Sequence, residues 1–376
     1  ANQPLPAHLP AALRSAFLSP FSRIGGTCHS LVTFAAWRRQ MKKPPVLVLY
    51  NLPMKAAGRH IESDRGILDE VSAVSTALSR LNRPFRCHGV RRLSEIPRAL
   101  SRGHEPVVFN LVERLDDHPA DYNLVPAVCR ASGRACTGSD SECLLLTFDK
   151  YLTKTRLLAA GVGVPAGTVV AQKASRESVT AGAVRPPYIV KPVSADGSEG
   201  IDCRSVINRQ GPSLERAVCR IHRICRQPAL IEHFVDGREF NISVLQAGTN
   251  IQVMPIAEID FSLFPARRPR IVDYDIKWRP GTIPGIVSPR KIPADVDPAQ
   301  ARQIRDTARR AWVACGCRDY ARIDMRMDHK GRLYVLEINA NPDISPKAGF
   351  PAALEAAGIP FDQFITTVLS NAISRQ

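Results

Sequence analysis

Asp324, Glu337 and Asn339 interrupt an otherwise apolar pattern between Arg322 and Pro346. The segment predicts two strands joined by a tight turn, and side chains two positions apart share one face of a strand. Carboxylate and amide oxygens are ligands that suit Mg²⁺, with water and phosphate oxygens completing the shell. These residues therefore indicate a metal site. A solvated strand face with ordinary ion pairs is the alternative that they leave open.

The turn predicts a register for this pair of strands. If Asp328 faces Gly331, then Asp324 lies opposite Val335 and diagonal to Glu337, within reach on the same face. Arg322 precedes Asp324 by two positions and shares its face.

A second segment, IVKPVSADGSEGI at 189–201, places Lys191 at the end of a strand and Gly197 and Ser198 in the loop that follows. Glycine-rich loops let backbone N–H groups approach phosphate oxygens. The G-x-x-x-x-G-K-[ST] pattern of a P-loop is absent. Considered alone, such a loop is more often a plain turn.

A third segment, LIEHFVDGREF at 230–240, places Glu232 at the end of one strand and Glu239 at the start of another. The two residues fit a hinge that binds a nucleotide base or sugar. Two ordinary carboxylates at a sheet edge are the alternative.

Together these segments resemble the ATP-grasp enzymes, and among them the D-alanine–D-alanine ligase group. The resemblance covers 46–373, and its motifs are more specific in combination than singly. They occur in the family's order: VFN, TGSD, TFDKYLTK, LLAAGVGVP, VKP with its loop, LIEHFVDGREF, DYDIKW and ARIDMRMD…LYVLEINANP.

The resemblance implies roles for single residues. Arg322 would stabilise an oxyanion, Ser198 would act in the closing loop, and Glu70 would bind the amine of the first substrate. Glu70 also suits the start of a helix for purely electrostatic reasons. Two Mg²⁺ ions, with Mn²⁺ as an alternative, would be held by Asp324, Glu337 and Asn339. ATP would be contacted by Lys150, Lys191, Gly197, Ser198, Glu232, His233, Val235, Glu239 and Lys277.

The resemblance also implies a reaction. A substrate carboxylate would take the γ-phosphoryl group of ATP, and the amine of a second substrate would attack the acyl phosphate. The family joins two D-alanines in peptidoglycan biosynthesis and suggests a homodimer. A ligase for another amino acid or small peptide, and a nucleotide-binding protein without turnover, are the alternatives.

Departures from the family pattern concern the amino-acid pocket. Gly197 stands where a second loop serine is usual, and Trp278 follows Lys277 where the dipeptide-forming ligases carry tyrosine. An indole has no phenol oxygen, so the usual serine–tyrosine hydrogen bond cannot form. Asp343 replaces a glycine. These changes put D-alanine in doubt and leave ATP and Mg²⁺ chemistry in place.

The elements that must position these residues fall into three parts. Segment 46–138 predicts an α/β domain, with buried strands at 46–50 and 107–111 and helices at 67–81 and 122–131. Segments 139–229 and 230–376 predict the central and C-terminal parts of a two-part ATP-grasp fold. The order of elements after Leu230 is mixed, which is typical of α+β folds. In the central and C-terminal parts together, we expect helices at 149–160, 213–226, 297–314 and 361–373. We expect strands at 188–191, 230–232, 239–246 and 251–259.

Composition excludes several classes of protein. The chain has 376 residues with 44% hydrophobic and 23% charged residues, as in soluble globular proteins. Its net charge of +16 comes with only 6% aromatics and no zinc-finger spacing, so we expect no nucleic acid partner. No apolar stretch is long enough to span a membrane. Ten scattered cysteines without a C-x-x-C pair suit a cytoplasmic protein.

The first 45 residues contain no Asp or Glu and six Lys or Arg. We expect a basic, disordered tail that does not belong to the fold. Sequence upstream of a start at Met41 is the favoured explanation, and a transit peptide is the alternative.

Overall fold

The computed structural model describes residues 43–53, 61–116, 118–174, 179–279 and 290–376. Residues 1–43 and 44–376 form separate units, and the account below concerns the second unit. The expected basic tail lies almost entirely outside the described residues.

The first sheet is parallel and has the strand order β2-β1-β3-β4. Alternate residues of β1 pack on opposite faces: Val46 and Val48 against α2, Leu47 and Leu49 against α3 and α4. The expected α/β part is therefore confirmed. Its strands are β1 (Val46–Asn51), β2 (Phe85–Val90), β3 (Val107–Leu111) and β4 (Ala135–Cys136), and its helices are α2 (Ile61–Arg80), α3 (Ile96–Ser101) and α4 (Val125–Ala131). The short 3₁₀ segments η2 (Leu93–Glu95) and η3 (Pro119–Leu124) precede α3 and α4, so the α-helix expected from Tyr122 begins only at Val125.

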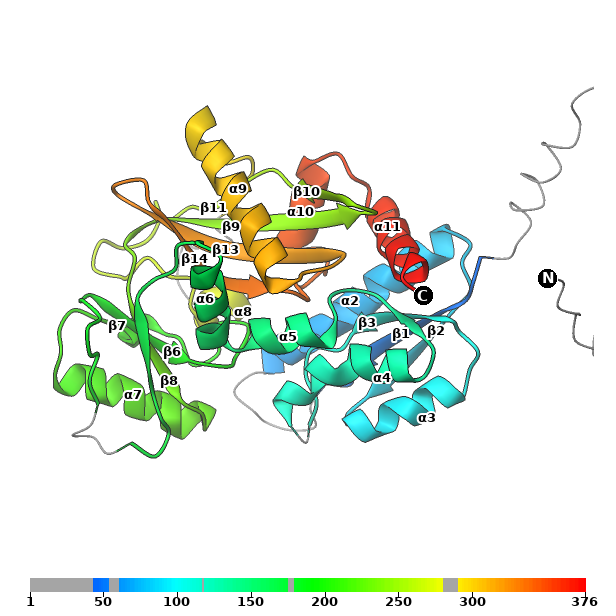
Figure 1. Cartoon of the computed structure of the whole chain (residues 1–376), viewed down its shortest axis with the longest axis horizontal. Helices are drawn as coiled ribbons and strands as arrows, with labels where there is room; N and C mark the ends of the chain where they lie inside the picture. Colours follow the sequence, from blue (N-terminus) through cyan, green and yellow to red (C-terminus); the bar gives the residue numbers. More distant parts are fainter. Residues whose placement is uncertain (1–42, 54–60, 117, 175–178, 280–289) are drawn as a thin grey trace, which may run out of the picture. The chain divides into compact units, whose positions relative to one another are not determined.

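The second sheet is antiparallel and has the order β5-β8-β6-β7, with α7 (Pro212–Cys225) covering one face (Figure 1). Its strands are β5 (Gly167–Val170), β6 (Tyr188–Pro192), β7 (Val206–Ile207) and β8 (Ala229–His233). A 3₁₀ turn, η5 (Cys203–Ser205), precedes β7. Residue 230 was the expected start of the C-terminal part, but β8 pairs with β5 and β6 of this central sheet.

The third sheet has six strands in the order β12-β11-β9-β13-β14, with β10 also paired to β9. Ile323, Met325 and Met327 of β13 pack beneath α9 (Pro298–Cys315), so the alternate residues of β13 face the other way. The strands are β9 (Gly237–Ala247), β10 (Asn250–Val253), β11 (Ala257–Ile259), β12 (Arg290–Lys291), β13 (Tyr320–Asp328) and β14 (Leu333–Asn339).

The single strand expected at 251–259 is wrong, because it is interrupted. Val253 pairs with Val244 and Ala257 with Asn241, so four steps on one strand match three on β9. The extra residue breaks the ladder between β10 and β11.

Helices α5 (Ser141–Phe148) and α6 (Lys150–Ala159) connect the three sheets. Each begins after an aspartate whose side chain caps it: Asp140 accepts from Cys143 N at 3.0 Å, and Asp149 from Leu152 N at 2.9 Å. Helix α6 contacts β5 and β14, which belong to different sheets. The short helix α8 (Tyr274–Trp278) begins after Asp273, whose side chain accepts from Ile276 N at 3.2 Å.

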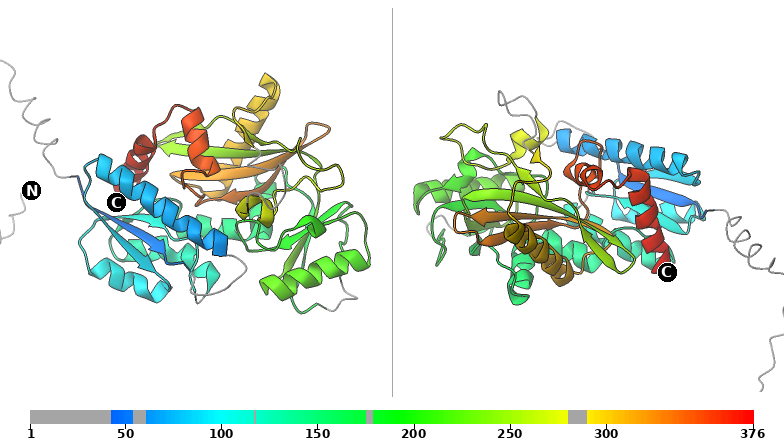
Figure 2. Two further views of the ribbon diagram at one scale, coloured as in Figure 1. Left: turned by 180° about the vertical axis from the view of Figure 1, so that it is seen from behind. Right: turned by 90° about the horizontal axis from the view of Figure 1, so that it is seen from above.

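The last two helices, α10 (Gly349–Ala356) and α11 (Phe361–Ser374), join the third sheet to the first. Phe350 and Phe364 pack with Val46 and Phe109 in one core. Figure 2 shows α11 beside α2, where Arg80 binds Asp362 at 2.6 Å. Within the described ranges, no helix has both the length and the apolar character needed to cross a bilayer.

Gly237 provides a test of how tightly β9 and β13 approach. It has a φ of +148°, and a Cβ atom there would collide with the carbonyl oxygen of Met327. We expect Gly237→Ala to lower the free energy of unfolding by roughly 3 kcal/mol, because strain and overpacking combine. Gly248 has a φ of +62° and open space around a Cβ. Gly248→Ala should cost only about 1 kcal/mol in urea unfolding, and equal losses would contradict this packing.

Candidate active site

A β-bulge sets the arrangement of the carboxylates on β13 and β14. Asp324 pairs directly with Glu337, and Met325 pairs with Val335, so Leu336 is an extra residue on β14. The predicted register, with Asp324 opposite Val335, is therefore wrong. Two features shift the pairing. Asp328 N donates to Arg332 O, so the turn is one residue longer than predicted, and the bulge adds a second shift that brings the two carboxylates face to face and not diagonal.

Asp324 is fully engaged by N–H donors. Its Oδ1 accepts from Arg322 Nε at 2.7 Å and Asn241 Nδ2 at 2.9 Å, and its Oδ2 from Arg322 Nη2 at 2.7 Å and Asn339 Nδ2 at 3.2 Å. Burial raises the pKa of Asp324, while the Arg322 guanidinium opposes this effect. A metal ion at Asp324 would therefore require Arg322 to turn away.

Glu337 faces positive charge. Lys150 Nζ lies 3.5 Å from Glu337 Oε2 and also donates to the carbonyl of Ala195. Burial acts to raise the pKa of Glu337, but the charges of Lys150, Lys191 and Arg322 outweigh burial and lower it to about 2. Glu337 is thus an anion at neutral pH, as a metal ligand must be.

The donor set fits Mg²⁺ rather than a metal that needs a protein cage. No group of three or more His, Cys, Asp or Glu side chains suited to a metal occurs in the described part of the chain. Asp324 and Glu337 offer two hard carboxylates, and Asn339 adds an amide on the same face. Mg²⁺ is commonly bound by one or two carboxylates and takes its remaining ligands from substrate phosphates and water.

Glu232 lies between two lysines. Its Oε2 is 2.6 Å from Lys191 Nζ and its Oε1 is 3.0 Å from Lys154 Nζ, with all three side chains at most 7% exposed. Burial would raise the pKa of Glu232, but the two ammonium groups lower it. Gly167 makes room, since a Cβ there would lie 3.0 Å from Glu232 Cγ. The Glu232 side chain therefore holds the two lysines, and its predicted contact with ATP stays a prediction.

Lys154 was missed by sequence reasoning. Its spacing of four from Lys150 places both on one face of α6, which is the signal that could have found it. Both lysines are buried on that helix.

Glu239 is held by Arg326, which the sequence analysis did not single out. Arg326 donates to Glu239 Oε2 from Nε at 2.9 Å and from Nη2 at 2.7 Å, and its Nη1 donates to Val235 O at 2.8 Å. Its guanidinium carbon lies 4.9 Å from the ring centre of Phe234. Burial raises the pKa of Glu239, and Arg326 opposes this effect.

At the end of β8, His233 Nδ1 lies 2.9 Å from the carbonyl oxygen of Arg185.

The loop after Lys191 is tied to α8. Trp278 Nε1 donates to Gly197 O at 2.9 Å, and Ser198 Oγ donates to Val272 O at 2.9 Å. Gly197 has a φ of +65°, and a Cβ there would lie 3.4 Å from Trp278 Nε1. The indole thus links the same two segments as the family's serine–tyrosine bond, with a backbone acceptor. Lys277 is exposed, and its Nζ lies 5.0 Å from the Trp278 ring centre.

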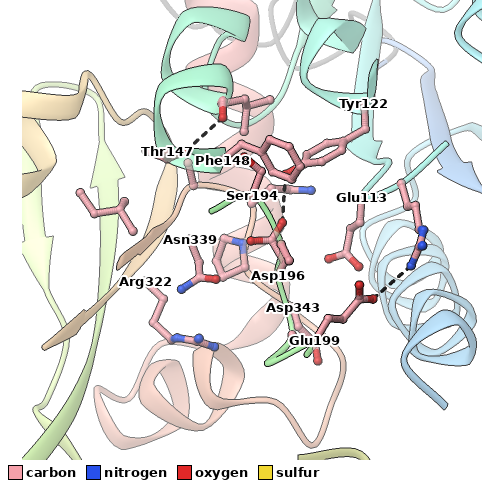
Figure 3. Close-up of a pocket in the computed structure, with 18 of the residues that line it drawn as sticks. Glu113, Tyr122, Thr147, Phe148, Ser194, Asp196, Glu199, Arg322, Asn339 and Asp343 are labelled. Atoms are coloured by element: carbon pink, nitrogen blue, oxygen red, sulfur yellow. Dashed lines mark hydrogen bonds and ion pairs between the residues drawn. The ribbon is translucent and has the colours of Figure 1, made fainter. Parts of the chain in front are cut away.

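A cavity of about 290 Å³ lies beside this face (Figure 3). This volume is near the lower limit for small-molecule sites, roughly 300–1,000 Å³. Arg322 and Asn339 line one side, and Glu113, Asp196 and Asp343 line another. Among the expected site residues Gly197 and Lys277 also line it. The other expected residues of the ATP and metal site do not: Lys150, Lys191, Ser198, Glu232, His233, Val235, Glu239, Asp324 and Glu337.

The acidic side of the cavity holds carboxylates close together. Burial, Asp343 and Asp196 raise the pKa of Glu113 to about 8. Tyr122 donates to Asp196 Oδ2 at 3.1 Å, and Arg114 pairs with Glu199 at 3.1 Å (Figure 3). Sequence reasoning noted Asp343 as a departure but missed Glu113 and Asp196, which no spacing pattern connects.

Glu70 is buried close to the acidic side of the cavity. It is 3% exposed and does not line the cavity, although Ile67, one turn earlier on α2, does. Burial first, and then the charges of Glu113 and Asp343, raise the pKa of Glu70 well above its usual value. The predicted role of Glu70, binding the amine of the first substrate, stays a prediction.

The Glu239–Arg326 pair gives a stability test of the site's frame. Glu239→Gln leaves the 3% exposed Arg326 side chain without its counter-charge, and we expect a loss of roughly 3 kcal/mol in the free energy of unfolding. Asp306→Asn removes the same charge from an exposed pair with Arg309 and should change it by less than about 0.5 kcal/mol. If denaturant titrations show that both variants lose the same free energy of unfolding, the buried pair does not stabilise the protein more than the exposed pair.

Comparison with known proteins agrees with this geometry. The family model described as "D-ala D-ala ligase C-terminus" matches residues 159–370. The uncharacterized protein y4sG of Sinorhizobium fredii is 30% identical over 269 residues, which cover 72% of this chain and 75% of that protein. A D-alanine–D-alanine ligase of Thermotoga petrophila is 29% identical over 266 residues, covering 71% and 79%.

A solved structure has the same fold. The crystal structure of D-alanine–D-alanine ligase from Bacillus anthracis, complexed with ATP, superposes with a TM-score of 0.67 over 88% of this chain and 98% of that chain. Its sequence identity of 14% carries the fold alone. Because the family model spans more than half of the sequence, we conclude that this chain belongs to the D-alanine–D-alanine ligase family, a family of ATP-dependent ligases with the ATP-grasp fold that form C–N bonds.

Proposed function

We propose that the protein is an ATP- and Mg²⁺-dependent carboxylate–amine ligase that joins two amino acids, or an amino acid and a small peptide. One observation carries the proposal. The face that bears Arg322, Asp324, Glu337 and Asn339 adjoins a cavity with carboxylates on another side. One chain thus offers cations and metal ligands for phosphates next to anions for an amine.

We assign Asp324, Glu337 and Asn339 to two Mg²⁺ ions, which would neutralise phosphate charge and favour attack by an anion. Lys150 and Lys191 would hold the phosphates. Glu239 would bind the ribose.

The chain's own residues would serve two chemical steps. In the first, an oxygen of the substrate carboxylate bonds to the γ-phosphorus of ATP, and ADP leaves. In the second, the neutral amine bonds to the carbonyl carbon of the acyl phosphate, inorganic phosphate leaves and the amine loses a proton. Arg322, released from Asp324 when metal binds, would donate to the oxyanion of this second step.

The 193–202 loop would keep water from the acyl phosphate. Its link to Trp278 holds it against α8, and exclusion of water prevents hydrolysis. Lys277, next to Trp278, would reach the γ-phosphate from this side.

The acidic wall suggests which substrates are accepted. Glu113, Asp196 and Asp343 line one cavity. The raised pKa of Glu113 keeps this carboxyl largely protonated in the empty cavity, and an ammonium group bound beside it would favour the carboxylate and form charge-assisted hydrogen bonds. Asp343 adds a negative charge at a position where the family pattern has none. We therefore propose that at least one substrate is more basic than alanine.

Glu337→Ala should abolish turnover, because one of two metal-binding carboxylates is lost. Phosphate release would be followed with ATP, Mg²⁺ and pools of D- and L-amino acids and dipeptides. Circular dichroism would show that the variant is folded. Turnover that survives in a folded Glu337→Ala protein would disprove the metal assignment, and ATP binding without stimulated release in the wild type would favour a binding protein.

Glu113→Gln should raise the KM of the amine substrate about tenfold, as expected for the loss of one charge-assisted hydrogen bond worth ~1.4 kcal/mol. The KM of ATP should stay within about twofold, because Glu113 does not contact the nucleotide side. Among the substrates in the pools, diamino acids should stimulate phosphate release most. Equal use of alanine, together with an unchanged amine KM in the variant, would contradict the substrate assignment.

A further inference from the structure

The β-bulge at Leu336 is joined to the nucleotide side of the site by one buried side chain. Leu336 is the extra residue that lets Asp324 face Glu337. Its carbonyl oxygen accepts a hydrogen bond from Lys154 Nζ at 2.6 Å. Bulges re-aim neighbouring side chains beside active sites, so a contact that fixes this bulge also fixes the carboxylate that follows it.

The same ammonium group contacts the second sheet. Lys154 Nζ lies 3.0 Å from Glu232 Oε1, and Glu232 in turn holds Lys191 at 2.6 Å. Lys154 therefore contacts β14 directly and β6 through Glu232. A lysine ammonium has three N–H donors, which is enough for both contacts.

The burial of this group is unfavourable unless the contacts are made. The Lys154 side chain is 5% exposed and Glu232 is 1% exposed. Burial lowers the pKa of Lys154 to about 8, with Glu232 opposing the shift and the charge of Lys191 adding to it. Lys191 already balances the charge of the Glu232 carboxylate, so Lys154 is not needed to neutralise it. Its placement is better explained by the carbonyl that it orients.

We propose that Lys154 is a positioning residue, whose ammonium group holds the Leu336 bulge against Glu232 and so aligns the metal-binding pair Asp324 and Glu337 with Lys191. This inference rests on the proposed function for its chemistry. Lys154 itself touches neither metal nor substrate in this arrangement; it acts through the β14 backbone and through Glu232.

Lys154→Met is the informative substitution. Methionine keeps the length and apolar stem of lysine but removes the charge and its N–H donors. The remaining Glu232–Lys191 pair is neutral, so no unpaired charge is left and the variant is expected to fold. Lys330→Met is the matched control, because Lys330 is exposed in the turn between β13 and β14.

The main measurement is the affinity for Mn²⁺ in the presence of a non-hydrolysable ATP analogue, by electron paramagnetic resonance. We expect Lys154→Met to weaken Mn²⁺ binding about tenfold or more, as for other residues that orient metal ligands, and Lys330→Met to leave it unchanged. Lys154→Arg, which keeps charge and donors, should lie between wild type and Lys154→Met. Should Lys154→Met fail to fold, Lys154→Gln replaces it with the same expected loss.

If Lys154 has only a structural role, Lys154→Met will lower the melting temperature but leave the Mn²⁺ affinity of the folded protein at the wild-type value. That result would overturn the proposal. Affinity in Lys154→Arg no better than in Lys154→Met would also overturn it. Because binding is measured without turnover, the comparison holds even if no amino acid stimulates phosphate release. Failure of the ligase assignment and failure of the Lys154 assignment are therefore distinguishable.

Discussion

Buried charge is the constraint on which the site depends. Lys150, Lys154 and Lys191 all lie at most 7% exposed, beside the carboxylates of Glu232 and Glu337. Ammonium groups removed from water are unfavourable unless anions and carbonyl oxygens surround them. The lysines come from α6 and β6, and the carboxylates from β8 and β14. Satisfying the charges therefore requires the second and third sheets to meet with α6 between them, which is where the proposed phosphates would bind.

Much of the fold was predictable because it rests on local patterns. The apolar runs at 46–50 and 107–111 became buried strands, and the 3.6-residue periodicity at 213–226 and 297–314 became helices α7 and α9. The Leu336 bulge and the break after Val253 were not predictable, since each depends on one extra residue placed by contacts with another strand. A period-two pattern reads the same with or without such a residue until a partner is known.

The sequence likewise predicted some residues of the candidate site and missed others. Arg322, Asp324, Glu337 and Asn339 were predicted to lie together because of their spacing, and the structure places them opposite one another on adjacent strands. Their roles stay predictions. Glu113 and Asp196 were missed, because the elements that bring them to the cavity are far apart in the chain. Lys154 was missed although its spacing of four from Lys150 on α6 was a local signal. Trp278 was read as the loss of a hydrogen bond, yet its indole N–H donates to Gly197 O. The side-chain types predicted the loss, whereas the backbone acceptor became visible only with the loop in place.

The central claim is that the face of Asp324 and Glu337 binds metal together with ATP. Its most direct test is a Mn²⁺ titration of the wild-type protein, with and without a non-hydrolysable ATP analogue, read by electron paramagnetic resonance. The account predicts weak binding to the protein alone, where Arg322 occupies Asp324, and two tightly bound Mn²⁺ ions per chain with the analogue. Mn²⁺ binding that equals the analogue's own, without a contribution from the protein, would contradict it.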